Sequence, residues 1–203
     1  SSHRILDLIN GIMEFRKTET QNRKMSVAKD DITSVIKEVG LRFKELNCNP
    51  KVVYTININS EDSNIYFDKE ILIIILNNLL SNAAKYTPEG EIKITFDSMK
   101  ENDIDYSVIS VSDTGYGINE ADLPHIFENY YQGSGKHQVA GSGIGLALVK
   151  GLADIHQAEL YVESKEELGA TFTLKFITDN TYPEAIHKKS IVAQQKELEL
   201  LDD

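Results

Sequence analysis

The sequence contains only one cysteine, Cys48, among its 203 residues. A single cysteine excludes a disulfide framework and favours a reducing compartment such as the cytosol. Long apolar runs are missing too, because the longest, residues 71–80, is far short of the roughly 20 residues that a membrane-spanning helix needs. No signal peptide is recognisable. We therefore expect a domain without a membrane span that folds in a reducing environment.

Basic residues are in deficit: the chain has 21 Lys and Arg against 32 Asp and Glu, a net charge of −11. This balance disfavours nonspecific binding to nucleic acid, because the phosphate backbone would be repelled. Hydrophobic residues make up 41% and charged residues 26%, which is typical of a globular chain rather than a disordered one. The length allows one ordinary domain plus a smaller appendage.

Two common nucleotide-binding motifs are absent. The chain has no G-x-x-x-x-G-K-[ST] segment, which excludes a P-loop. The glycine-rich segment 141–145 is not a Rossmann fingerprint either, because a long polar loop rather than a strand precedes it. No internal repeat is apparent.

The patterns that are present alternate between helix and strand. Asp68 is a plausible N-cap for a helix that Thr87-Pro88-Glu89-Gly90 ends, and residues 115–145 form a glycine-rich region with short helical pieces. The expected helices are 1–23, 30–46, 69–86 and 144–157, and the expected strands are 51–58, 91–99, 105–113, 159–164 and 170–177.

This order of elements indicates an α+β fold. Neighbouring strands are close enough in sequence to form antiparallel hairpins, and 167–170 reads as one hairpin turn. We expect a two-layer α/β sandwich in which helices cover one face of a mixed, mostly antiparallel sheet of about five strands. A long N-terminal helix precedes it.

One helix carries polar residues in an otherwise apolar run, "LNNLLSNAAKYTPEG" at 76–90. At about 100° per residue, Asn78, Asn82 and Lys85 fall within roughly 40° of one another. Asparagine is a mediocre helix former, and buried amides are costly without partners. This stripe therefore predicts that a polar group lies over it.

Glycine clusters mark three further places. Gly141, Gly143 and Gly145 stand at a helix start, where backbone N–H groups and the helix dipole suit phosphate, although such a cluster taken alone more often forms a tight turn. Asp113 ends a strand just before Gly115. It is either a turn former or an acceptor for the amino group of adenine.

Taken together, five segments resemble the catalytic, ATP-binding domain of sensor histidine kinases. They are "NLLSNAAKY" at 78–86, "DTGYG", "IFENYYQ", "GSGIGLALVK" and "GATF", in the order of that family's N, G1, F, G2 and G3 boxes. The resemblance covers about residues 26–177. It implies the Bergerat fold shared with DNA gyrase and mismatch-repair ATPases, with ATP and Mg²⁺ bound under a flexible lid at about 128–143.

The resemblance also implies a role for individual residues. Asn82 gives its amide oxygen to Mg²⁺ and Asn78 helps to hold the metal, while Lys85 reaches the phosphates and Tyr86 flanks adenine. Asp113 binds the adenine amino group. The remaining nucleotide-binding positions that it implies are Gly115 and Gly117 beside the base, Ile118, Phe127 as the anchor of the lid, Gly141, Gly143 and Gly145 around the phosphates, Leu146, and Thr171 near the adenine on the sheet floor.

Two departures from related patterns bear on mechanism. ATPases of this fold place a glutamate general base one turn before the metal-binding asparagine, and here that position is Asn78, which cannot take a proton. We therefore expect slow hydrolysis and transfer to another acceptor. The family's acceptor is a histidine followed by an acidic residue, and none of His3, His125, His137, His156 and His187 has that neighbour. We expect His125 and His137 to be solvated and His156 to end a helix.

The resemblance thus divides the chain into three parts. Residues 1–25 are the end of a dimerisation hairpin, 26–177 the catalytic ATP-binding domain and 178–203 a C-terminal linker. The implied function is transfer of the ATP γ-phosphate to a histidine outside these residues, for relay to a response-regulator receiver domain. The resemblance implies that the full-length protein is a homodimer anchored in the inner membrane. These residues would be part of its cytoplasmic portion and inactive alone. The alternatives are a degenerate nucleotide-binding module that stabilises a kinase dimer, and a protein-serine kinase of the same fold.

Overall fold

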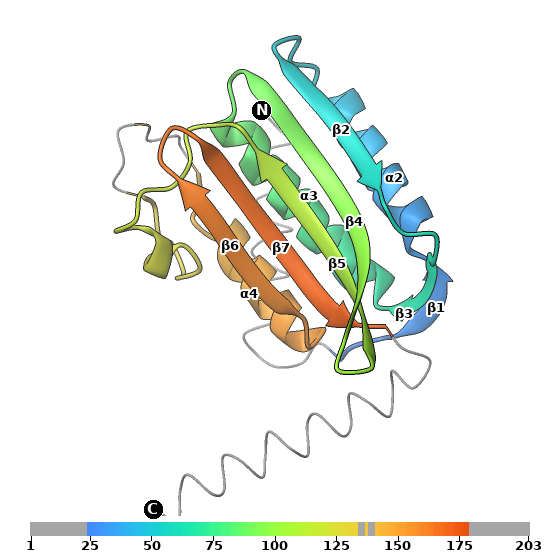
Figure 1. Cartoon of the computed structure of the whole chain (residues 1–203). Coiled ribbons are helices and arrows are strands. Elements are labelled where there is room, and N and C mark those ends of the chain that lie inside the picture. The colour runs from blue at the N-terminus through green and yellow to red at the C-terminus, as the bar shows by residue number, and fades with distance from the viewer. Residues whose placement is uncertain (1–23, 134–136, 138–140, 179–203) are drawn as a thin grey trace, which may run out of the picture.

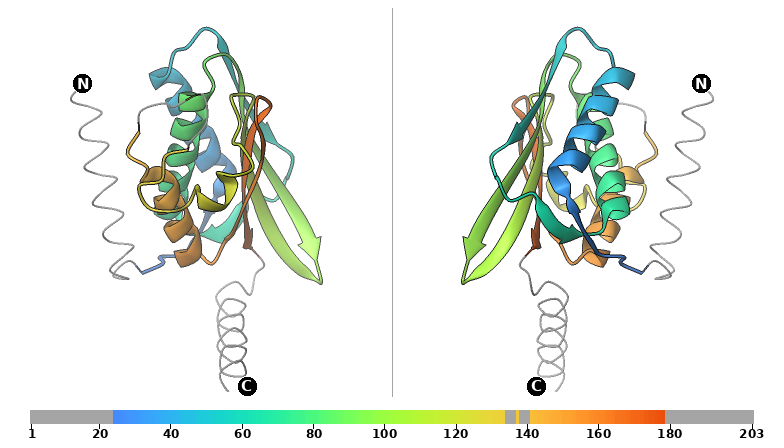
Figure 2. Two further views of the ribbon diagram at one scale, coloured as in Figure 1. Left: turned by 90° about the vertical axis from the view of Figure 1, so that its left-hand side faces the viewer. Right: turned by 90° about the vertical axis from the view of Figure 1, so that its right-hand side faces the viewer.

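A computed structural model describes residues 24–133, 137 and 141–178. These residues form two layers, a sheet with helices on one face only (Figures 1 and 2). The expected helix at 1–23 and the tail from residue 179 onward lie outside the described residues. The α+β sandwich predicted for the central part of the chain is confirmed.

Three helices and five strands lie where the sequence patterns predict them. The helices are α2 (Ile32–Leu46), α3 (Lys69–Tyr86) and α4 (Gly145–Ile155), and the strands are β2 (Val52–Ile58), β4 (Gly90–Glu101), β5 (Ile104–Asp113), β6 (Glu159–Lys165) and β7 (Gly169–Ile177). The short helical piece expected after the glycine-rich turn is the 3₁₀ helix η1 (Leu123–His125).

The five strands form one sheet in the order β2-β4-β5-β7-β6. β2 runs parallel to β4, and the other three pairs are antiparallel. Two short strands were not predicted, β1 (Ala28–Asp31) and β3 (Asn64–Phe67), which pair with each other in a separate two-stranded sheet. Each has four residues, too few for a clear alternation of apolar and polar positions.

Aspartates begin two of the helices. The Asp31 carboxylate accepts hydrogen bonds from the backbone N–H groups of Thr33 and Ser34 at the start of α2. Asp68 accepts one from Ile71 N, 3.0 Å away, and a second from Ser26 N. An N-cap satisfies backbone donors that have no partner within the helix, so these residues fix where α2 and α3 begin.

The core lies between the sheet and the helices. Strand alternation points Phe96 of β4, Ile109 of β5 and Phe172 of β7 toward the helical layer, where each is at most 3% exposed. On the helical side, Ile75 and Leu79 of α3 are equally buried. Each such side chain contributes roughly 1.5–3 kcal/mol by leaving water. Because its apolar side is committed to this core, α3 turns its polar stripe toward the loop region that follows β5.

His156, directly after α4, is buried in the same core with 2% of its surface exposed. Its Nε2 accepts a hydrogen bond from the backbone N–H of Asp68, and its ring packs edge-on against Phe176. A histidine at the end of this helix was expected. Its role is to join the end of α4 to the beginning of α3.

Burial lowers the pKa of His156 to about 4 from its ordinary 6.5, although the Asp68 charge opposes this. The unfolded chain thus binds the proton more readily, and this part of the stability is complete above pH 6.5 and lost as the pH falls toward 4. Between about pH 7.5 and about pH 5 we expect the wild type to lose about 2 kcal/mol more unfolding free energy than His156→Gln, measured by urea unfolding. Equal losses would contradict this role.

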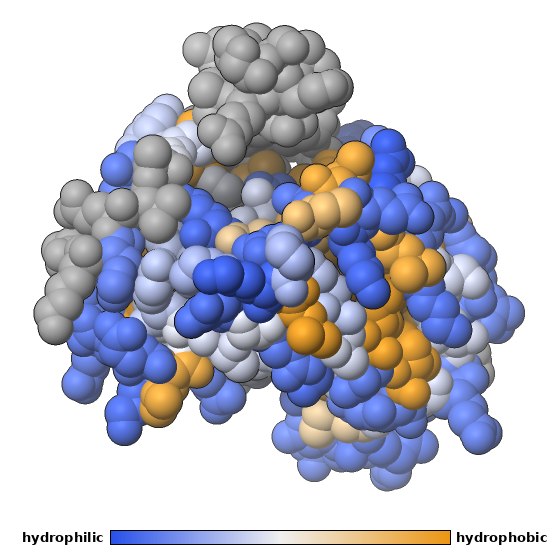
Figure 3. Space-filling model, turned by 90° about the horizontal axis from the view of Figure 1, so that it is seen from above, coloured by the Kyte–Doolittle hydropathy of each residue, from blue (hydrophilic) through white to orange (hydrophobic). Residues whose placement is uncertain are grey.

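The surface is uneven in character. Hydrophobic residues gather on the side of β2 and α2, where Leu41, Leu46 and Val53 are each more than half exposed (Figure 3). None of the residues that line the pocket described below comes from α2 or β2. In the described ranges, no helix combines the length and the apolar character that crossing a membrane requires.

Candidate functional site

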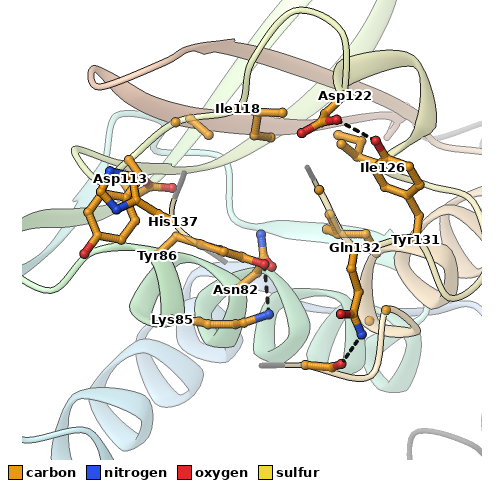
Figure 4. A pocket seen from close by; sticks show the side chains of 18 of the residues that line it. Asn82, Lys85, Tyr86, Asp113, Ile118, Asp122, Ile126, Tyr131, Gln132 and His137 are labelled. Carbon is orange, nitrogen blue, oxygen red and sulfur yellow. Dashed lines mark hydrogen bonds between the residues drawn. The ribbon is translucent and has the colours of Figure 1, made fainter. Parts of the chain in front are cut away.

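A pocket of about 400 Å³ opens between α3, the loops around η1 and the start of α4 (Figure 4). This volume is in the usual range for small-molecule sites. Eleven of the residues implied by the sequence line it: Asn78, Asn82, Lys85, Tyr86, Asp113, Gly117, Ile118, Gly141, Gly143, Gly145 and Leu146. Their contact with a nucleotide stays a prediction.

Three predicted residues do not line the pocket. Phe127 packs edge-on against Phe172 in the core. Gly115 packs directly against the end of α3, since a Cβ there would lie 2.2 Å from the Tyr86 carbonyl oxygen. Thr171 falls on the other face of β7, because buried and half-buried positions alternate along this strand. The structure brings Ala170 rather than Thr171 to the pocket.

The polar stripe of α3 forms one wall of the pocket. The Nδ2 of Asn78 donates to the Ile74 carbonyl oxygen at 2.8 Å, and the amide oxygen is thereby left facing away from its own helix. A Cβ on Gly145 would lie 3.3 Å from that oxygen, so Asn78 points it at the first residue of α4. Asn82 lies one turn further along the same wall.

Lys85 and Tyr86 complete this wall. The Lys85 ammonium donates a hydrogen bond of 2.8 Å to the Tyr86 hydroxyl, beside Asn82 (Figure 4). Of the pocket residues that the structure describes, Lys85 is the only lysine or arginine. It is therefore the cation best placed to meet an anionic ligand.

Asp113 lies at the far end of the pocket. Alternation along β5 puts it on the same face as the buried Ile109 and Val111, so its carboxylate points toward the helical layer. Burial raises the pKa of Asp113, and hydrogen bonds from the backbone N–H groups of Gly115 and Ala170 oppose the shift. One oxygen is held by Gly115 N at 2.9 Å. The carboxylate also lines the pocket, where a ligand donor such as an amino group can reach it.

The turn after Asp113 requires glycine. Gly117 has φ +67°, and a Cβ there would lie 2.1 Å from the Lys165 carbonyl oxygen. This close approach brings the turn against the hairpin of β6 and β7, and it leaves Ile118 N donating to the Ser164 hydroxyl. The Asp113 end of the pocket is thus formed by backbone packed directly against backbone.

The other end of the pocket is the beginning of α4. The N-cap residue of this helix is Ile144, whose apolar side chain cannot accept a hydrogen bond from the first N–H groups of α4. Gly143, with φ +67°, and Gly145 both line the pocket without side chains. Helix N-terminal N–H groups without such a cap, reached past glycines, form a natural site for phosphate oxygens.

Several pocket residues were not predicted. Those outside the sequence expectation are Ser81, Tyr116, Asn119, Asp122, Ile126, Tyr131, Gln132, Gly133, Ser142, Glu166 and Ala170. Tyr131 and Gln132 belong to the segment "IFENYYQ", which the sequence analysis identified as a motif without assigning a role to these two residues. For Asn119 and Asp122, the only signal in the sequence was their three-residue spacing, which is typical of a polar turn.

His137 was expected to be solvated surface, and it is exposed, but its ring also makes contacts that the sequence did not predict. Its ring stacks on Tyr116 with the ring centroids 3.8 Å apart, and Nε2 lies 3.3 Å from a Glu167 oxygen. It lines the pocket near Asp113 (Figure 4). His125 is about half exposed, as expected.

A magnesium ion fits these residues only together with a nucleotide. Across 24–133, 137 and 141–178, no group of three His, Cys, Asp or Glu side chains is arranged to hold a metal. The amide oxygens of Asn78 and Asn82 are neutral ligands. Mg²⁺ is commonly held by one or two protein oxygens plus substrate phosphates and water, and the uncapped start of α4 lies beside the Asn78 oxygen.

Comparison with known proteins agrees with this geometry. Residues 67–180 match the family described as histidine kinase-, DNA gyrase B-, and HSP90-like ATPase. The chain is 34% identical over 180 residues to histidine kinase P4 of Formosa agariphila, covering 85% of this chain and 13% of that protein.

Two solved structures are similar as well. Full-length ShkA in complex with AMPPNP matches with a TM-score of 0.73 and 25% identity, over 87% of this chain and 36% of ShkA. The nucleotide-free catalytic domain of histidine kinase ThkA matches with a TM-score of 0.63 over 75% of this chain and 98% of that domain, and its 24% identity supports the fold alone. The chain therefore spans only a small part of the curated relative and of the full-length structure.

Proposed function

This chain belongs to the family of histidine kinase-, DNA gyrase B- and HSP90-like ATPases, and from that premise we propose that it is the kinase domain of a two-component sensor histidine kinase. It binds ATP with Mg²⁺ and transfers the γ-phosphate to a histidine that lies outside these 203 residues. A response-regulator aspartate then receives the phosphate.

One observation carries the proposal: the polar stripe of α3 and the glycine-lined start of α4 face each other across a single pocket. Asp113 accepts a hydrogen bond from the adenine amino group at one end. Lys85 and the N–H groups at the start of α4 hold the phosphates at the other end.

Asn82 and Asn78 are the residues that hold Mg²⁺ in this proposal. When bound, the ion neutralises charge that develops on the phosphate oxygens during transfer. The charge of the pocket explains why Mg²⁺ is needed. Asp113, Asp122 and Glu166 are all acidic, and Lys85 is the only Lys or Arg among the described residues of the lining. A triphosphate without a metal would be repelled by these carboxylates.

Transfer is favoured over hydrolysis because no base activates water at the α3 wall. Asn78 occupies the position one turn before Asn82, and an amide takes no proton at neutral pH. Its amide is also fixed by the bond to Ile74, with the oxygen toward α4. We therefore expect slow hydrolysis of bound ATP.

The wider setting is part of the same proposal. Residues 1–25 end a dimerisation hairpin through which two copies associate, and the parent protein is anchored in the inner membrane with this domain in the cytoplasm. The alternative is a degenerate module that binds nucleotide only to stabilise a dimer. The presence of Asn78, Asn82, Lys85 and the glycines at the start of α4 in one pocket supports the kinase instead.

Labelling with γ-³²P-ATP tests the proposal. The full-length protein with Mg²⁺ should acquire label that is stable in alkali and labile in acid, as phosphohistidine is, much faster than it releases inorganic phosphate. The 203-residue chain alone should acquire no stable label. Nucleotide binding by the full-length protein without any label would favour the degenerate module, and fast phosphate release would contradict transfer as the main reaction.

A further inference from the structure

A buried carboxylate lies on the pocket wall opposite Asp113. Asp122, directly before η1, is 5% exposed and yet lines the pocket (Figure 4). The proposed binding of ATP gives it no direct role, and a carboxylate is an unfavourable neighbour for phosphates unless its oxygens already have hydrogen-bond donors.

Both carboxylate oxygens of Asp122 accept hydrogen bonds from the protein. Asn119 Nδ2 donates to one at 2.8 Å, and the Tyr131 hydroxyl donates to the other at 2.6 Å. The Asn119 side-chain oxygen accepts from Asp122 N in return, which closes a small polar turn. The same bond from the Tyr131 hydroxyl raises the pKa of that tyrosine. Asp122 thus holds Tyr131 to the η1 turn.

The residues beside Tyr131 are tied to the segment that leads into α4. Tyr130 N donates to the Gly143 carbonyl oxygen at 2.9 Å, and Gln132 Nε2 donates to the Gly141 carbonyl oxygen at 2.7 Å. A Cβ on Gly143 would lie 2.6 Å from the Tyr130 carbonyl carbon, so the two segments touch directly. We call residues 130–133 together with 141–143 the stem.

The stem continues into the phosphate end of the pocket. Gly143 lies two residues before Gly145, the first residue of α4, and Gly145 meets the amide oxygen of Asn78. A continuous set of contacts therefore runs from Asp122 through Tyr131 and the stem to the proposed metal ligand. None of these contacts reaches Asp113 at the base end.

We infer that Asp122 is a positioning residue that, through Tyr131, holds the stem so that the start of α4 faces Asn78 where the triphosphate binds. The inference rests on the proposed function and deepens it: Asp122 sets affinity for the phosphates and leaves recognition of the base alone. The Asp122–Tyr131 bond keeps the carboxylate occupied and away from phosphate oxygens.

Tyr131→Phe tests this inference, because it removes only the hydroxyl. We expect the affinity for Mg²⁺·AMPPNP, measured by calorimetry, to fall about tenfold, the usual scale for losing one hydrogen bond to a charged group. Affinity for adenosine, measured by NMR titration, should stay the same. Tyr161→Phe is the matched control, since Tyr161 also donates its hydroxyl to a carboxylate, that of Glu159, on β6 outside the pocket. It should change neither affinity.

A second variant guards against a simple loss of folding. Asp122→Asn keeps the size of the side chain but turns an amide N–H₂ toward either Asn119 or Tyr131, so it should give the same selective loss. Combining it with Tyr131→Phe should cost no more than the larger single loss, because the two residues act as one unit.

The outcomes separate this inference from the proposed function. A wild-type chain that binds neither ligand overturns the proposed function. A wild type that binds both, with Tyr131→Phe binding Mg²⁺·AMPPNP equally well, overturns the inference alone. Equal losses for AMPPNP and adenosine also overturn it, because they indicate a general structural role.

Discussion

Replacing Asn82 by alanine is expected to lower affinity for Mg²⁺·AMPPNP about a hundredfold. Changing residues that merely support a metal ligand costs about 10–100-fold in metal affinity, so removal of a ligand should reach the upper end of that range. Asn82 lines the pocket one turn after Asn78, on a wall whose only described Lys or Arg is Lys85. Calorimetry with and without Mg²⁺ measures the effect, and the loss should be much smaller when Mg²⁺ is absent.

Asn77→Ala is the control for this experiment. Asn77 lies on the same helix and is exposed, and it is not among the residues that line the pocket. It should bind the nucleotide like the wild type. If the wild type and Asn82→Ala bound Mg²⁺·AMPPNP equally well, Asn82 would not be a metal ligand. Equal losses of affinity in Asn82→Ala and Asn77→Ala would instead indicate damage to α3 as a whole.

Replacing Asp113 by asparagine is expected to change which base the pocket prefers. The variant keeps one side-chain oxygen, for which Gly115 N is a donor at 2.9 Å in the wild type, and it presents an amide N–H₂ in place of the other oxygen. A donor there faces the amino group of adenine, which is also a donor, and we expect about a hundredfold lower affinity for Mg²⁺·AMPPNP. The same donor suits the carbonyl oxygen of guanine, so affinity for Mg²⁺·GMPPNP should rise relative to AMPPNP.

Competitive titration of the two nucleotides measures this change. Asp103→Asn makes the same chemical change at the tip of the hairpin between β4 and β5, and Asp103 does not line the pocket. It should keep the wild-type preference for adenine. If Asp113→Asn also kept that preference, the base would have to bind elsewhere.

Much of the fold was accessible from the sequence because the periodic segments are long. The five strands of the main sheet and three helices follow their patterns, and Asp68 begins α3 as its capping position predicts. β1 and β3 were missed because their pairing is a tertiary event: Ala28 pairs with Phe67, almost 40 residues away. Four-residue strands carry too little pattern to be recognised alone.

The pocket was predicted well where a residue's environment depends on its own helix or turn. Asn78, Asn82 and Lys85 share a wall because helical spacing requires it. Thr171 was carried over from a motif, although alternation along β7, with apolar residues at 172, 174 and 176, already favours Ala170 for the pocket side. Sequence order could not reveal the bond from Tyr131 to Asp122, because it depends on how the chain returns from η1.

His137 illustrates a further limit of the sequence. A histidine between glycines, serines and polar residues is predicted to be solvent-exposed, and His137 is, but nothing local predicts an aromatic partner. The structure stacks it on Tyr116, twenty-one residues earlier in the chain, within the pocket lining. Contacts between separate loops of this kind require the whole fold.

A crystal structure of the chain grown with saturating Mg²⁺·AMPPNP tests the central claim most directly. We predict Mg²⁺ about 2.1 Å from the amide oxygen of Asn82, phosphate oxygens at the start of α4, and the adenine amino group donating to Asp113. Nucleotide bound elsewhere, or an empty pocket with Asn82 and Asp113 facing bulk solvent, would contradict the account.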